Sequence, residues 1–77
     1  MSLPTDYPSF VGEVAELLEV APAELGADDS LLDFGLDSIR LMSLVERLRA
    51  AGVAVSFDQL AESPTLRNFA AHLGLKP

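Results

Sequence analysis

Residues 34–40 read FGLDSIR, and this stretch places one serine at the point where a short polar loop becomes a helix with apolar periodicity. The first N–H groups of a helix lack intrahelical partners and carry a partial positive charge, so a hydroxyl there is well placed to hold a phosphate. The alternative is that Asp37 or Ser38 only caps the helix, which is the commoner role of such a pair. The two roles have to be weighed against the rest of the chain.

The composition indicates one small folded domain. With 77 residues the chain can build one modest core but not two, so we expect a single domain over residues 1–77. No apolar run approaches the ~20 residues that span a bilayer. The absence of cysteine excludes disulfides and thiolate metal sites. Met1–Pro4 lacks the basic and apolar regions of a signal peptide, so we expect a cytoplasmic protein.

The charge is unevenly distributed along the chain. Twelve acidic and five basic residues give a net charge of −7, which argues against nucleic acids and anionic membranes as partners. Residues 1–37 hold nine of the acids and no base, whereas residues 38–77 hold three acids and all five bases. The helix that begins at Ser38 is therefore not acidic.

Apolar periodicity predicts two longer helices in the first two thirds of the chain. The first covers residues 7–20 and stops before Pro22, and the second covers residues 38–51 and stops at Gly52. The segment between them, residues 21–37, is long for a loop in so small a domain. We expect it to be ordered and irregular, because four apolar residues can anchor it: Leu25, Leu31, Leu32 and Phe34.

A short third helix is predicted next. Ser56 and Gln59 fit the capping-box pattern, in which the serine caps the helix and the glutamine reaches back to it. The predicted helix runs from Phe57 to Ala61. It is the shortest helix of the predicted fold.

The last helix is predicted to have Ser63 as its cap and Pro64 as its first residue, and to end at Gly74. The apolar residues 53–55 have no partner run elsewhere in the chain, so we predict no strand. The expected fold is all-α: a small four-helix bundle with three main helices and one short third helix.

Ile39 and Met42 do not belong to the core face of the second helix. At about 100° per residue, Ile39 lies roughly 190° and Met42 roughly 110° from the centre of the stripe that faces the core. That stripe consists of Leu41, Leu44, Val45 and Leu48. We therefore expect Ile39 and Met42 to face solvent or a partner. The alternative is that Ile39 folds back onto the preceding loop, against Phe34 or Leu36.

These features together resemble the carrier proteins of nonribosomal peptide, polyketide and fatty acid synthesis. The resemblance covers nearly the whole chain and includes the G-x-D-S turn at residues 35–38 and the S-P-T-L entry to the last helix at residues 63–66. It implies that Ser38 receives a 4′-phosphopantetheine arm from coenzyme A through a phosphopantetheinyl transferase. The arm ends in a thiol that carries an acyl group as a thioester. Asp37 has a supporting role toward the transferase in this family, which is compatible with a role as helix cap.

Within the family, residues 35–42 (GLDSIRLM) look most like aryl carrier proteins of siderophore assembly, and the non-acidic second helix agrees. By resemblance, the chain is a monomer that meets an adenylating enzyme and a condensation or other acyl-processing domain. The residues implied in these contacts are Ile39, Arg40, Met42, Phe57 and Ala61; Phe57 has a competing role as a core anchor. The alternatives are a peptidyl, β-aminoacyl or polyketide acyl carrier, and an unmodified helical interaction module.

An enzyme is not expected. The one histidine, His72, reads as an ordinary surface or edge residue, and no nucleophile elbow or phosphate-cradling glycine loop occurs. Asp28, Asp29 and Asp33 lack the spacing, central glycine and terminal glutamate of a calcium loop. We therefore assign no catalytic residue and no metal site.

Overall fold

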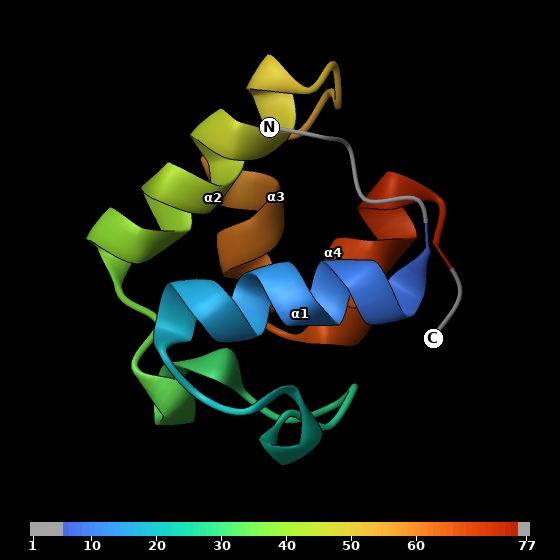
Figure 1. Cartoon of the computed structure of the whole chain (residues 1–77). Helices are drawn as coiled ribbons and strands as arrows, with labels where there is room; N and C mark the ends of the chain where they lie inside the picture. Colours follow the sequence, from blue (N-terminus) through green and yellow to red (C-terminus); the bar gives the residue numbers. More distant parts are fainter. Residues whose placement is uncertain (1–5, 76–77) are drawn as a thin grey trace.

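The structure is a computed structural model that describes residues 6–75, so Met1–Pro4 lies outside the described residues. Within that range the chain forms four α-helices and no strand (Figure 1). The helices are α1 (Tyr7–Leu18), α2 (Ser38–Ala50), α3 (Phe57–Glu62) and α4 (Leu66–Leu73). Two short 3-10 turns, η1 (Pro22–Glu24) and η2 (Leu31–Phe34), lie between α1 and α2. The all-α prediction, with a short third helix, is confirmed.

The caps of α1 explain its length. At its start, the Asp6 carboxylate accepts a hydrogen bond from the backbone N–H of Ser9 at 2.9 Å. At its end, Glu19 adopts the left-handed conformation with φ of 59°, and its N–H closes onto carbonyls of the preceding turn. The helix therefore ends at Leu18, before the predicted end at Val20.

The segment between α1 and α2 is ordered and irregular, as predicted. Leu25 and Leu31 are buried and Phe34 is half-buried, so these three anchors are confirmed. The fourth, Leu32, is wrong as an anchor, because 59% of its surface is exposed. Leu31 and Leu32 are neighbours in the 3-10 turn η2, and successive residues of such a turn point in different directions, so only one of them can face the core.

Hydrogen bonds tie this segment to the start of α4. The N–H of Leu31 donates to the carbonyl of Pro64 at 2.8 Å, and the N–H of Arg67 donates to the carbonyl of Ala27 at 2.9 Å. The guanidinium of Arg67 also donates to both carboxylate oxygens of Asp28. These hydrogen bonds hold the pKa of Asp28 below its usual value and raise that of Arg67.

The ends of α2 and α3 agree closely with the predictions. The helix α2 ends at Ala50, one residue before the predicted end, and Gly52 beyond it has a φ of 96°. The capping box of α3 is present: Ser56 Oγ accepts from the N–H of Gln59 at 3.3 Å, and Gln59 Oε1 accepts from the N–H of Ser56 at 3.0 Å.

The predicted start of α4 is wrong. Ser63 ends α3, and Thr65 caps α4, because the Thr65 hydroxyl accepts the N–H of Asn68 at 3.1 Å. Pro64 lies in the turn between the two helices and not in the first turn of α4. The side-chain amide of Asn68 donates to the carbonyls of Ser63 at 2.9 Å and Gln59 at 3.2 Å, which ties the end of α3 to α4.

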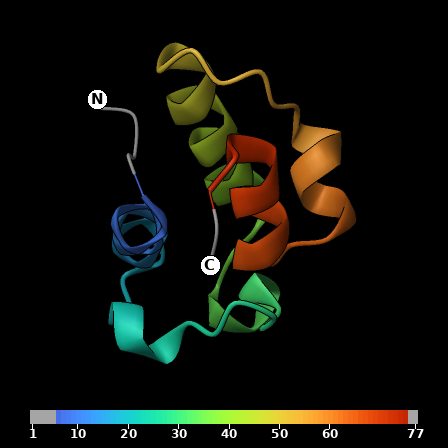
Figure 2. The same cartoon turned by 90° about the vertical axis from the view of Figure 1, so that its right-hand side faces the viewer.

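One apolar core joins the helices. The helix α1 packs against α2 and α4, and α2 packs against α3. Figure 2 looks along the axis of α1 and shows α4 between α1 and α3. The predicted stripe of α2 is buried, and so are apolar side chains of each of the other three helices: Phe10, Val14, Leu60, Leu66 and Phe69. At the start of α2 the core buries Leu41 and leaves Ser38 and Ile39 at the surface.

Candidate functional site

Ser38 is the first residue of α2, and its side chain is exposed. The chain reaches it through Gly35, whose φ of 98° ends η2 in a conformation that costs glycine no steric strain. Leu36 follows and is buried at 4% exposure. On the other side of the serine, Leu41 is buried in the core. Buried leucines on both sides therefore fix the turn, while the serine itself stays accessible.

Asp37 is the cap of α2. Its backbone is extended, and its carboxylate Oδ1 accepts the N–H of Arg40 at 2.8 Å. Of the two candidate caps, Asp37 and Ser38, the structure uses Asp37. The hydroxyl of Ser38 is therefore not used in capping.

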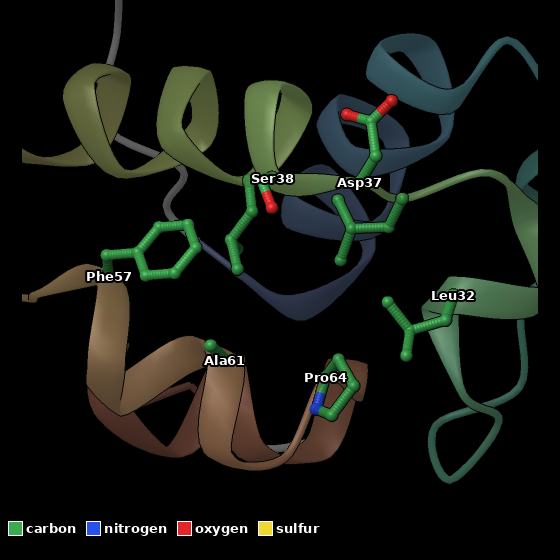
Figure 3. Close-up of a pocket in the computed structure, with 8 residues that line it drawn as sticks. Leu32, Asp37, Ser38, Phe57, Ala61 and Pro64 are labelled. Carbon is green, nitrogen blue, oxygen red and sulfur yellow. The ribbon is translucent and has the colours of Figure 1, made fainter.

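A pocket opens beside Ser38. It has a volume of about 380 Å³ and lies where the start of α2 meets η2 and α3. Figure 3 shows the Ser38 hydroxyl directed toward this pocket and the Asp37 carboxylate directed away from it. Apart from these two residues the lining side chains are apolar: Leu32, Leu36, Leu41, Phe57, Ala61 and Pro64. The site thus combines a free hydroxyl with an apolar cavity.

Two exposed apolar side chains follow the serine along α2. Ile39 is 82% exposed and Met42 is 44% exposed, so the predicted outward orientation of both residues is confirmed. The alternative that Ile39 folds back onto the loop is wrong. Leu32 of η2 is a third large exposed apolar residue. These three side chains expose apolar surface around Ser38 to water.

The short helix α3 brings two more predicted residues to the site. Phe57 is half-buried: its ring packs against the core and also lines the pocket. The two competing roles of Phe57 are therefore structurally compatible. Ala61 lies one turn later, is exposed, and lines the pocket as well. Four predicted residues, Asp37, Ser38, Phe57 and Ala61, thus meet at one cavity.

Arg40 lies apart from this pocket. Its guanidinium pairs with the carboxylate of Glu19 at 3.5 Å and so joins the start of α2 to the end of α1. It also packs against the turn before Ser38, 3.7 Å from the point where a side chain at Gly35 would begin. Arg40 therefore helps to hold α2 against the end of α1.

Four residues of the site are not expected there from the sequence: Leu32, Leu36, Leu41 and Pro64. The sequence predicts Leu32 and Leu41 to face the core and Pro64 to lie in the last helix, and it suggests Leu36 only as a contact of Ile39. The isolated leucine between Gly35 and Asp37 could have indicated a buried anchor, because both its neighbours favour a turn. For Pro64 no local signal exists, since a distant segment brings it to the pocket.

Residues 6–75 contain no group of three histidine, aspartate or glutamate side chains that could bind a metal ion. None of the helices in the described part of the chain is long and apolar enough to cross a membrane.

Comparison with known proteins identifies the family. Residues 9–73 match the family described as "Phosphopantetheine attachment site". The chain is 46% identical over 57 residues to an isochorismatase of Bacillus subtilis. This match covers 74% of the chain and 18% of the isochorismatase. The chain is 54% identical over 54 residues to phenyloxazoline synthase MbtB of Mycobacterium tuberculosis and 53% identical over 57 residues to pyochelin synthetase PchE of Pseudomonas aeruginosa.

Each of these two matches covers 70% of the chain but only 4% of the synthase or synthetase. The chain thus spans less than a fifth of each relative. No solved structure matches it. The chain therefore belongs to the phosphopantetheine attachment family and is a non-catalytic carrier protein whose cofactor is a covalent 4′-phosphopantetheine.

Proposed function

We propose that Ser38 is the residue to which the arm is attached, and that the arm carries an aryl group in siderophore-type biosynthesis. The observation that carries the proposal is the exposed hydroxyl of Ser38 at the first position of α2, next to an apolar pocket. A transferase must reach the hydroxyl that it modifies, and an exposed hydroxyl at a fixed helix start is accessible to it. The helix N-terminus also favours the negative charge of a phosphodiester.

The two hydroxyls that cap α-helices are already in use. Ser56 accepts the N–H of Gln59, and Thr65 accepts the N–H of Asn68. At Ser38 the neighbouring carboxylate of Asp37 has taken over the capping role. This division of roles supports Ser38 as the reactive hydroxyl and gives Asp37 a structural task beside its expected support of the transferase.

The reaction needs only this hydroxyl from the chain. The Ser38 oxygen forms a bond to the pantetheine-bearing phosphorus of coenzyme A, the bond from that phosphorus to the bridging oxygen of the pyrophosphate breaks, and adenosine 3′,5′-bisphosphate leaves. The serine proton is lost to solvent or to a base of the transferase. When attached, the arm supplies a thiol that holds an acyl group as a thioester.

Intact-mass measurement tests the attachment residue. The protein is incubated with coenzyme A, magnesium and a promiscuous phosphopantetheinyl transferase. We expect the wild type to gain one phosphopantetheinyl unit, Ser38→Ala to gain none, and the control Ser43→Ala on the same helix to gain one. An unmodified wild type, or an equal gain on Ser38→Ala, would contradict the proposal.

The aryl cargo is supported by the local sequence of residues 35–42 and by the similarity to the synthetase MbtB, named a phenyloxazoline synthase, and to PchE, named a pyochelin synthetase. Loading assays on the modified protein test it. We expect an enzyme that adenylates salicylate or 2,3-dihydroxybenzoate to load the arm at least tenfold faster than enzymes that adenylate amino acids. Faster loading by an aminoacyl enzyme would assign the chain to the peptidyl or β-aminoacyl carriers instead.

We further propose that an adenylating enzyme and a condensation or other acyl-processing domain dock around Ser38. The proposed contacts are Ile39, Met42, Phe57 and Ala61, together with Arg40 at the edge. Support comes from the exposure of Ile39 and Met42 and from the shared pocket wall of Phe57 and Ala61. We also propose that the chain forms a single domain, is a monomer and lies in the cytoplasm. The cytoplasmic location agrees with coenzyme A as an intracellular donor.

A further inference from the structure

The pocket beside Ser38 has a role that attachment alone does not require. It is larger than a packing defect, since about 380 Å³ lies within the range of small-molecule sites, and Ser38 itself is one of its lining residues. A group bonded to the Ser38 oxygen begins at the pocket wall. Any part of that group close to the phosphate is therefore held at high effective concentration next to the pocket.

The chemistry of the lining selects which part of the arm fits. All lining side chains other than Asp37 and Ser38 are apolar, and the Asp37 carboxylate points away from the pocket (Figure 3). Two backbone groups at the pocket are already paired: the carbonyl of Pro64 accepts the N–H of Leu31, and the N–H of Leu41 donates to the carbonyl of Asp37. An amide placed against the apolar side chains would lose hydrogen bonds to water that these side chains cannot replace.

The phosphopantetheine arm has one compact apolar group near its phosphate, the two methyl groups on the pantoyl carbon. Its two amides follow farther out, and the thiol with the cargo lies at the far end. For the cargo to enter the pocket, the arm would have to fold back and lay both amides against apolar side chains. The dimethyl group reaches the pocket without such folding.

Resting on the proposed attachment at Ser38, we propose that the pocket seats the dimethyl group of the arm and not the cargo. The seat is formed by Leu41 of α2, Leu36 of the preceding turn, and Phe57 and Ala61 of α3. It fixes the direction in which the arm leaves the protein and keeps the amides and the thioester in solvent, where partner domains reach them. The seating is the same whether or not the thiol carries an acyl group.

Isotope-filtered nuclear Overhauser spectroscopy tests the seat. The protein is labelled with ¹³C, modified with unlabelled coenzyme A, and shown by mass to be fully converted. We expect contacts from the dimethyl protons to the methyl groups of Leu36 and Leu41 and to the ring of Phe57. We expect none from the protons beside the thiol. The same pattern is expected after loading with salicylate.

A matched pair of variants locates the contact. Ala61→Leu places a larger side chain at the pocket wall, whereas Ala71→Leu makes the same change at an exposed position of α4 that does not line the pocket. We expect the dimethyl contacts to weaken at least threefold in Ala61→Leu and to be unchanged in Ala71→Leu.

Three results would overturn the seat: no dimethyl contact in the modified wild type, contacts that appear only when cargo is loaded, or equal contacts in both variants. The wild-type spectrum alone is sufficient if Ala61→Leu does not fold. A wild type that gains no mass at Ser38 would refute the proposed attachment instead, so the two failures can be told apart.

Discussion

At the scale of single residues, the site separates two tasks that local sequence cannot separate. A D-S pair before a helix supplies two side chains that can cap, and both satisfy the same backbone N–H groups. The structure gives the cap to Asp37, whose carboxylate accepts the N–H of Arg40, and leaves the Ser38 hydroxyl exposed. An exposed hydroxyl can be modified without loss of the cap.

Replacing Asp37 separates its capping role from its charge. Asp37→Ala should lower the free energy of unfolding by about 0.5–2 kcal/mol, because the first turn of α2 loses its cap. Asp37→Asn retains a good cap and should stay within about 0.5 kcal/mol of wild type. Urea unfolding measures both. If the two variants lose the same stability, the cap is not what Asp37 contributes.

The rate of phosphopantetheine transfer to these two variants adds an independent measurement. A slow reaction of Asp37→Asn with unchanged stability would assign the negative charge to the transferase step.

Met42 and Leu44 lie on the same helix and differ in exposure, at 44% and 2%. Met42→Ala should cost less than about 1 kcal/mol of stability, as expected for a largely exposed site. Leu44→Ala should cost about 2–5 kcal/mol, because it leaves a cavity in the core. Thermal or urea unfolding checks the pair, and acyl loading of Met42→Ala checks the proposed docking role. A multi-kcal loss for Met42→Ala would place that side chain in the core.

The spacing of about 100° per residue predicted the exposure of Ile39 and Met42, because α2 is a regular helix of more than three turns. The prediction that Leu32 anchors the loop had no such periodicity behind it and was wrong, because Leu32 lies in a 3-10 turn too short to establish one. An apolar residue in such a turn has no pattern to indicate its side. The outward apolar surface could thus be predicted on α2 but not on η2.

At the scale of elements, the structure differs from the prediction at the junction between α3 and α4. The sequence Ser63-Pro64-Thr65 offers two possible caps, and local preference favours Ser63 with proline in the first turn. The structure uses Thr65, since the carbonyl of Pro64 accepts a hydrogen bond from Leu31 of η2. A contact between segments that are distant in sequence therefore sets the helix start.

The pair of Asp28 and Arg67 ties the same loop to α4 and should make stability depend on pH. Its hydrogen bonds hold the pKa of Asp28 below the usual value, so the folded state binds this proton less readily than the unfolded state. The contribution is present above the unfolded pKa of about 3.9 and is lost as the pH falls through the lower folded pKa.

The stability gap between wild type and Asp28→Asn should therefore be largest near neutral pH and close toward acid. Urea unfolding at a series of pH values measures this gap. Arg67→Gln removes the other partner of the same pair and should show the same trend. A gap that is constant with pH would mean that the ion pair contributes nothing.

At the scale of the whole molecule, the pocket could not have been predicted, because η2, α2, α3 and the α3–α4 turn all contribute to it. Periodicity assigns residues to faces of one element, whereas a cavity depends on how the elements meet. The four helices, the buried stripe of α2 and the serine at its start could be read from the sequence. The cavity that Ser38 faces required the packed structure.

The acidic half of the chain should make stability increase with salt. The described residues fit within 27 × 24 × 19 Å, and the chain carries a net charge of −7. At 0.01 M salt the Debye length is about 30 Å, so the excess of negative charge gives a net repulsion across the whole molecule; at 1 M it is about 3 Å, and only direct contacts remain. The structure has two ion pairs within residues 6–75 to oppose this repulsion, and both are at the surface.

We therefore expect the melting temperature to rise between 0.01 and 1 M sodium chloride. Glu16→Gln removes one exposed charge near the end of α1, where a negative charge also opposes the helix dipole. This variant should melt higher than wild type at low salt and like wild type at high salt. A melting temperature that falls with salt would instead mean that the two surface ion pairs outweigh the repulsion of the acidic segment, and the uneven charge would then stabilise the fold.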